Sequence, residues 1–204
     1  MAHAAPPPFL IPSDAATLAV MPRLFDMQVR TPRLQIAHEP APVVADHVEA
    51  VNASLASLRP YLYWSRPEQT REHIEKNLKD LLRWHVAGQH AIYIMRLHDG
   101  RFAGMLGFHH FNALVPAAEV GYWMRDDLTG QGLMTEALQA VSDYALQVAG
   151  VHRLQLVAAR PNAASRRVAR KCGFEEEGVR RQSFRLLDGS LADEFVYVRF
   201  GAGV

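Results

Sequence analysis

The sequence predicts a single α/β domain with a mixed sheet. The chain has 204 residues, of which 49% are hydrophobic, enough for one sizeable core but not comfortably for two. Runs that alternate apolar and polar residues, typical of strands, are interspersed with stretches that are apolar at every third and fourth position, typical of helices. In the stretch 119–138, an apolar run, a glycine turn and an amphipathic stretch follow one another. The predicted order is strand, two helices, three strands, helix, strand, helix and two strands.

Strands are predicted where apolar positions alternate or cluster between turn residues, at 33–37, 90–97, 102–111, 119–124, 153–158, 179–187 and 192–200. Helices are predicted where apolar residues recur at helical spacing, at 42–59, 67–88, 133–148 and 161–173. Pro42 and Pro67 open the first two helices, and Gly173 takes the C-cap position of the last.

A proline-rich segment precedes this pattern. Prolines at positions 6, 7, 8, 12 and 22 predict an extended arm over residues 1–24, followed by a folded domain over residues 25–204. The arm has no basic segment at its start, and its prolines interrupt any apolar run, so we expect no signal peptide. Apolar side chains at 9–11 and 18–21 need a surface to cover them, so we expect a homodimer.

Charge and cysteine content exclude several classes of function. With 22 basic and 21 acidic residues the net charge is +1, which offers no field to attract nucleic acid or an anionic membrane. The single cysteine, Cys172, excludes an intramolecular disulfide and a thiolate zinc cluster, and fits a reducing compartment. Its helical spacing with Ala164 and Val168 predicts a core position. No apolar run approaches membrane-spanning length, and we expect a cytoplasmic protein.

The turn at residues 129–132 (Thr-Gly-Gln-Gly) is the first candidate binding element. It joins the predicted strand 119–124 to a helix that starts at Leu133. The first N–H groups of a helix have no internal acceptor, and the helix dipole favours an anion there. Gly130 and Gly132 allow a ligand to approach the backbone closely. A glycine pair that only makes a tight turn is the alternative.

Four motifs in order resemble a known family. They are 127–132 (Asp-Leu-Thr-Gly-Gln-Gly), 119–124 (Glu-Val-Gly-Tyr-Trp-Met), 133–138 (Leu-Met-Thr-Glu-Ala-Leu), and 160–165 (Arg-Pro-Asn-Ala-Ala-Ser) leading to 171–174 (Lys-Cys-Gly-Phe). Over residues 30–200 the chain resembles the GCN5-related N-acetyltransferases (GNAT), in particular their RimJ/RimL-like branch of ribosomal-protein N-terminal acetyltransferases. Asp127 departs from the family pattern, which has Arg or Gln there, and this argues against a phosphate contact from that side chain.

The resemblance implies a fold and an activity. The fold is a mixed, mostly antiparallel sheet with helices on both faces and a V-shaped split between the strands at 119–124 and 153–158. The activity is transfer of an acetyl group from acetyl-CoA to a primary amine by direct attack in a ternary complex, without a metal. Another acyl donor such as succinyl-CoA, a small-molecule amine acceptor, and a non-catalytic acyl-CoA-binding module are the alternatives.

The pKa of the amine favours a particular acceptor. A protein α-amino group, with a pKa near 7.7–8.0, is about a tenth neutral at pH 7, whereas lysine, near 10.4, is almost fully charged. A site with one candidate general base is suited to the α-amino group, because this amine loses its proton more readily than lysine does. Together with the resemblance, this predicts the α-amino group of a protein or peptide.

The resemblance also implies site residues. Glu119 is the expected general base, acting through a water, and its alternative is a solvated strand-end carboxylate. Asn162 is predicted to cap the N-terminus of a helix and also to contact pantetheine. Ser165 is expected to lie near the cofactor's sulfur. The tyrosine acid of many relatives is replaced by Ala169, so Ser165 or a water would protonate the thiolate. The expected cofactor-binding residues are Tyr122, Trp123, Met124, Thr129, Gly130, Gln131, Gly132, Leu133, Met134, Thr135, Asn162 and Ser165.

The remaining candidates are ambiguous. A basic face at positions 166, 167, 170 and 171 is either solvated or contacts the 3′-phosphate of CoA. His109 and His110 are adjacent on a strand and are predicted to point to opposite faces, so they cannot form a paired metal site; one of them could assist proton removal. An aromatic segment at 61–64 is predicted as packing or as an acceptor contact, and the three glutamates at 175–177 as a solvated turn.

Overall fold

The structure is a computed structural model that describes residues 21–201. Its eight strands form one sheet: β1 Gln28–Arg30, β2 Leu34–Ala37, β3 Ala91–Leu97, β4 Phe102–Asn112, β5 Ala117–Met124, β6 Arg153–Ala159, β7 Glu175–Arg185 and β8 Leu191–Phe200. The α-helices are α2 Pro22–Phe25, α3 Val44–Ala53, α4 Leu55–Leu58, α5 Arg71–Val86, α6 Leu133–Gln147 and α7 Ala163–Lys171. Short 3-10 helices lie at Tyr63–Ser65 (η1) and Asp126–Leu128 (η2).

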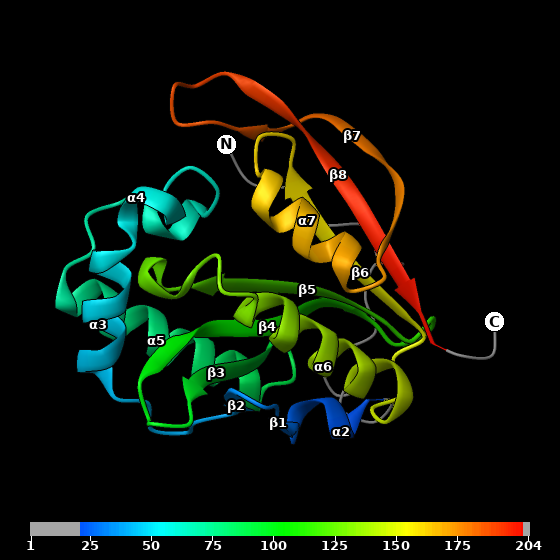
Figure 1. The fold of residues 1–204 in the computed structure, drawn as a ribbon, viewed down its shortest axis with the longest axis horizontal. Coiled ribbons are helices and arrows are strands. Elements are labelled where there is room, and N and C mark those ends of the chain that lie inside the picture. Colours follow the sequence, from blue (N-terminus) through cyan, green and yellow to red (C-terminus); the bar gives the residue numbers. More distant parts are fainter. Residues whose placement is uncertain (1–20, 202–204) are drawn as a thin grey trace, which may run out of the picture.

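The sheet is mixed and mostly antiparallel, as predicted. Its strand order is β1-β2-β3-β4-β5-β6-β8-β7, and β5 and β6 are the parallel neighbours. Helices α3 and α5 lie against one face, and α6 lies against the other (Figure 1). Two apolar clusters follow from this layering: a large one beneath α6, and a smaller one between α3, α5 and the strands β3 to β5.

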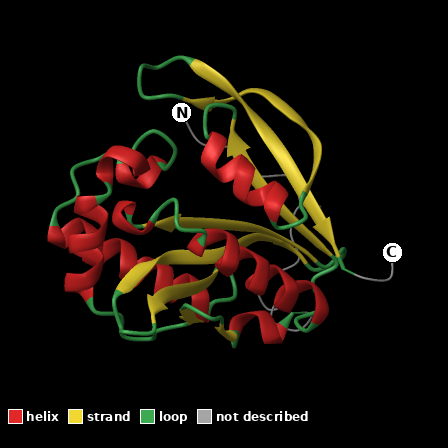
Figure 2. Ribbon diagram, viewed as in Figure 1, coloured by secondary structure: helices red, strands yellow, loops and turns green. Residues whose placement is uncertain are grey.

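The split between the central strands is present. β5 and β6 pair at Ala117 with Arg153, at Ala118 with Leu154, and at Glu119 with Gln155. Beyond Glu119, β5 continues beside β4, while β6 continues beside β8, so the two strands diverge. Figure 2 shows the resulting separation of the β6–β7–β8 group from the rest of the sheet.

Several element boundaries differ from the prediction. β1 was not predicted, because three residues are too few for an alternating pattern. The helix predicted at 42–59 is divided at Ser54, whose hydroxyl accepts the backbone N–H of Asp126 over 3.1 Å. The helix predicted from Pro67 begins at Arg71, because the Thr70 hydroxyl caps it by accepting the His73 N–H.

The prediction of a turn at residues 175–177 is wrong. These glutamates begin β7, where Glu175 pairs with Val198, and the Glu177 carboxylate forms an ion pair with Arg153. Cys172 is buried in the large cluster, as predicted. No helix within residues 21–201 is long and apolar enough to cross a membrane.

Part of the predicted arm is packed against the domain. Met21 and Leu24, which fall inside the segment 1–24, are fully buried in the large apolar cluster. Residues 22 and 23 of that segment belong to helix α2 and not to an extended arm, and residues 1–20, including the apolar residues 9–11, lie outside the described residues.

Candidate active site

The glycine turn ahead of α6 has the geometry of an anion cradle. Gly130 and Gly132 have φ angles of +73° and +78°, and Gly132 is the N-cap of α6 with no side-chain cap hydrogen bond. The Thr129 hydroxyl donates to the Asp126 carbonyl over 2.8 Å, and the Gln131 amide donates to the Asp127 carbonyl over 3.0 Å. These two side chains therefore hold the turn in shape, and the first backbone N–H groups of α6 are left for a ligand.

An arginine that was not predicted lies beside this turn. Arg33 Nη1 donates to the Gln131 carbonyl over 2.8 Å, and Arg33 Nε forms an ion pair of 2.6 Å with Glu136 on α6. Although burial opposes the shift, hydrogen bonds from Thr31 and Arg33 hold the pKa of Glu136 below its ordinary value. The contact joins residues 98 positions apart, so no local pattern could have found it. It places a half-exposed cation where an anionic ligand would sit.

Asp127, the departure from the family pattern, is engaged elsewhere. Its carboxylate pairs with Arg125 over 2.8 Å, and Arg125 also pairs with Glu49 on α3. The pair with Arg125 holds the pKa of Asp127 below its ordinary value. The Asp127 carboxylate is thereby turned toward Arg125, which it shares with Glu49.

Glu119 lies where β5 and β6 part. Its Oε2 accepts a hydrogen bond from Gln155 Nε2 over 2.8 Å, and its side chain is 15% exposed. His110 Nδ1 lies 3.4 Å from the same oxygen. Glu119 is therefore oriented by neighbours from both adjacent strands.

The prediction that His109 and His110 point to opposite faces is wrong. The β4–β5 register is irregular between His109 and Asn112, and His110 has a φ of +50°. This break in the strand rotates His110, so that the two rings lie 4.6 Å apart and both reach Glu119. Burial lowers the pKa of His109 to about 4, against the opposing charge of Glu119.

Tyr122 and Ser165 meet across the split. The Tyr122 hydroxyl lies 3.0 Å from Ser165 Oγ on α7, and the Ser165 N–H donates to the Asn162 side chain over 3.1 Å. Burial raises the pKa of Tyr122 above its ordinary value, so its phenol stays protonated. Ala169, which replaces the family tyrosine, is buried in the core. The phenol beside Ser165 therefore comes from Tyr122 on β5 and not from α7. The residue pattern of α7 could not have predicted this contact.

Alternation along β5 places the predicted residues Met124 and Trp123 on opposite faces of the sheet. Met124 is buried in the large cluster with Leu133 and Met134, so these three residues can offer a ligand mainly their backbone groups. The Thr135 carbonyl accepts the Cys172 thiol over 3.3 Å. Trp123 points to the opposite face of the sheet, where it packs against Trp64 with ring centroids 5.9 Å apart.

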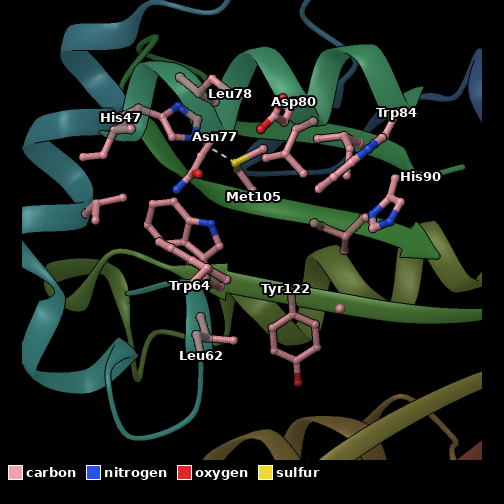
Figure 3. Close-up of a pocket in the computed structure, with 18 of the residues that line it drawn as sticks. His47, Leu62, Trp64, Asn77, Leu78, Asp80, Trp84, His90, Met105 and Tyr122 are labelled. Atoms are coloured by element: carbon pink, nitrogen blue, oxygen red, sulfur yellow. Dashed lines mark hydrogen bonds between the residues drawn. The ribbon is translucent and has the colours of Figure 1, made fainter. Parts of the chain in front are cut away.

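A cavity of about 430 Å3 lies on that opposite face, between α5 and strands β4 and β5. Trp64 and His47 line one part of it, and Trp84 and His90 lie toward the other end (Figure 3). His109 also lines it, which connects the cavity to the neighbourhood of Glu119. In Figure 3 the Tyr122 ring points away from α5, toward the far side of the sheet.

The predicted basic face of α7 is mostly exposed, and two of its arginines contact β8. Arg166 lies 3.8 Å from the ring centroid of Phe195 and donates to the Tyr197 hydroxyl, as does Arg170. Arg167 and Lys171 are exposed and remain available for a phosphate.

The aromatic segment at 61–64 links the two sides of the split. The Tyr61 hydroxyl donates to the Pro161 carbonyl over 3.2 Å, and the Tyr63 hydroxyl accepts the Arg185 N–H over 2.9 Å. The segment therefore borders both the cavity and the α7 side.

A sheet split beside a helix start that can bind an anion, with a carboxylate at its vertex, is the arrangement expected of an acyl-CoA-dependent transferase. Residues 41–175 match the family model described as the acetyltransferase (GNAT) domain. The chain belongs to the acetyltransferase (GNAT) family, as the motifs predicted.

Curated relatives agree with this assignment. A ribosomal-protein-serine acetyltransferase of Escherichia coli (strain K12) is 28% identical over 142 residues, which cover 70% of this chain and 78% of that protein. YdaF, YjcK and YoaA of Bacillus subtilis (strain 168) are 35%, 33% and 33% identical over segments covering 46%, 49% and 52% of their own lengths. The chain thus spans about half the length of these three relatives.

Solved structures extend the similarity over most of the chain. RimL, a ribosomal L7/L12 α-N-protein acetyltransferase in complex with coenzyme A, matches with a TM-score of 0.79 at 25% identity, over 86% of this chain and 98% of that chain. The acetyltransferase from Salmonella typhimurium that modifies the N-terminal serine of ribosomal protein L7/L12 matches with a TM-score of 0.73 at 26% identity, over 83% and 96% of the two chains.

Proposed function

We propose that this protein is an acetyl-CoA-dependent N-acetyltransferase that acts on the α-amino group of a protein or peptide. The observation that carries the proposal is the end of β5–β6 pairing at Glu119, which leaves backbone groups of both strands free beside the α6 cradle. The names of the E. coli relative and of RimL, both ribosomal-protein acetyltransferases, support a protein acceptor.

The residues fit the cofactor in three places. The cradle at Thr129–Met134, with Arg33 beside it, suits the pyrophosphate of CoA, since it offers backbone donors and a cation. The wall formed by Tyr122, Asn162 and Ser165 is polar and suits pantetheine and the thioester sulfur. Arg167 and Lys171 are the remaining candidates for the 3′-phosphate.

The chain's own groups can then complete direct transfer. Glu119, through a water, accepts the proton of the amine as the C–N bond forms. Ser165, hydrogen-bonded to Tyr122, donates its proton to sulfur as the C–S bond breaks with its electron pair on sulfur, and solvent restores the serine proton. The protein mainly positions the reactants and supplies donors where charge develops.

A competition among acceptors tests the proposal. Acetyl-CoA is supplied with a free-N-terminus peptide, an N-blocked lysine peptide, spermidine or an aminoglycoside, and the released thiol is measured; a parallel series uses succinyl-CoA. We expect turnover on the free-N-terminus peptide with acetyl-CoA, and loss of that turnover in Glu119→Gln. Turnover confined to spermidine or the aminoglycoside would refute the α-amino group as acceptor. Faster turnover with succinyl-CoA would refute acetyl-CoA as the donor. CoA binding without turnover would indicate a binding module.

We further propose a cytoplasmic homodimer. The single cysteine fits a reducing compartment, and the apolar residues at 9–11 and 18–20 need a covering surface. Sedimentation of the full chain at micromolar concentration tests the dimer, and a monomer there would refute it.

A further inference from the structure

A cluster of metal-binding side chains lies beside Glu119. One donor atom each from His109, His110 and Glu119 lies within 4.8 Å of the other two. The separation of His110 Nδ1 and Glu119 Oε2 is 3.4 Å. Tetrahedral zinc, with bonds of about 2.0–2.1 Å, holds its ligands roughly 3.3–3.4 Å apart, so this pair already has the required spacing. The His109 nitrogen, within 4.8 Å of the other two donor atoms, needs to approach by at most about 1.4 Å to complete the set.

The backbone builds this arrangement at a local irregularity. His109 faces Glu119 directly across β4 and β5, and the next residue would point to the other side of a regular strand. His110 instead adopts a φ of +50°, in the left-handed region that histidine enters more readily than most residues. Such irregularities in strands re-aim side chains, and here the result is a second imidazole beside the same carboxylate.

Neighbouring groups orient the ligands. Gln155 Nε2 holds the Glu119 carboxylate over 2.8 Å, the kind of supporting hydrogen bond that metal ligands usually have. Gly121 leaves room for the His109 ring, because a Cβ at Gly121 would lie 3.1 Å from His109 Nε2. His110 is 76% exposed, so the cluster is open to an ion and to a water as fourth ligand.

We propose that His109, His110 and Glu119 bind a divalent transition-metal ion, for which zinc is the best match, and that the bound ion blocks acetyl transfer. Two imidazoles and one carboxylate suit zinc, whereas magnesium and calcium prefer oxygen ligands alone. The blocking effect rests on the proposed function, because it follows from the metal occupying the carboxylate that would accept the amine's proton.

Metal binding is measured first, without any substrate. The tag-free full chain is treated with a chelator, desalted and titrated with zinc by calorimetry, with cobalt by visible absorption, and with magnesium as a control ion. We expect one zinc per chain, a cobalt spectrum of a four-coordinate site and no magnesium binding. His110→Asn, which tolerates the positive φ, and His109→Gln should each weaken zinc binding by about 10-fold or more. The exposed His152→Ala is the matched control and should bind as the wild type does.

The outcomes separate this proposal from the proposed function. Absence of zinc binding, or equal binding by wild type and His110→Asn, would overturn the metal site. If zinc binds and the wild-type acetyltransferase is inhibited by zinc and restored by the chelator, the blocking effect is supported. Zinc binding without inhibition would overturn that effect alone, and a protein that binds zinc but acetylates no amine would refute the proposed function and leave the metal site standing.

Discussion

Gln155 Nε2 donates to Glu119 Oε2 over 2.8 Å, and these two residues form the last pair between β5 and β6. The hydrogen bond therefore holds the carboxylate at the vertex of the split, on the side where the two strands begin to diverge. A carboxylate in this position is held by the sheet itself and does not depend on a loop.

The proposed role of Glu119 as a general base gives the first prediction. Glu119→Gln should lower kcat/KM by about 100-fold or more, the usual scale for loss of a general base. CoA affinity should be unchanged, because the cradle at the start of α6 does not involve this carboxylate. Steady-state kinetics and calorimetry measure the two quantities, and Glu75→Gln, on the surface of α5, is the control. Wild-type kcat/KM across the pH range would rule out this role.

The second prediction concerns the cradle. Gly130 and Gly189 are a matched pair, since both have positive φ angles, +73° and +84°, and an added Cβ would meet nothing within 4 Å at either. Alanine at either position should lower the free energy of unfolding by about 1–2 kcal/mol, the cost of the left-handed conformation. Only Gly130→Ala should also weaken CoA binding, because only there would the Cβ enter the space of the ligand. Equal CoA affinity in the two folded variants, measured by calorimetry, would remove the cradle from the CoA site.

A third prediction tests whether Tyr122 and Ser165 act as a unit. Their hydroxyls are 3.0 Å apart, so Tyr122→Phe and Ser165→Ala should each lower kcat, by up to about 100-fold for loss of a general acid. The double variant should be no slower than the slower single variant, since both substitutions break one proton path. Rate losses that multiply in the double variant would show independent roles, and unchanged rates would show that a water serves as the acid.

Stability toward acid gives a fourth prediction. Burial lowers the pKa of His47 to about 4, with Arg96 acting in the same direction and Glu39 and Asp46 opposing it. Below pH 6.5 the unfolded chain binds a proton that the folded His47 does not accept until about pH 4. The contribution of His47 to the free energy of unfolding is therefore complete above pH 6.5. Between pH 6.5 and 4 it declines by up to about 3 kcal/mol.

The variant His47→Leu isolates this contribution. Denaturant unfolding at pH 7.5 and pH 5 should show a smaller loss of stability for the variant than for the wild type. Part of the loss will persist in both proteins, because burial also lowers the pKa of His85 to about 4. Equal losses in the two proteins would contradict the assignment of this pH dependence to His47.

The sequence alone determined the features that nearby residues control. The turn at Gly130–Gly132, the Asn162 cap of α7 and the order of most strands depend on dihedral preferences and on hydrogen bonds within a few residues. The family motifs then assigned expected roles to these local features. The prediction differed from the structure where an element was too short to show a pattern, as at β1. It also differed where a distant partner overrode the local preference, as at Ser54.

Only the tertiary structure decided which distant groups share the site. Arg33 reaches the cradle from 98 residues away, and Tyr122 reaches Ser165 across the split. His110 turns toward Glu119 because the β4–β5 register shifts there, whereas strand periodicity assumes a regular strand. Side-chain periodicity reports the face of an isolated element, but contacts between elements depend on register and packing. For this reason the sequence predicted the cradle and the base, and the fold alone assembled the groups around them.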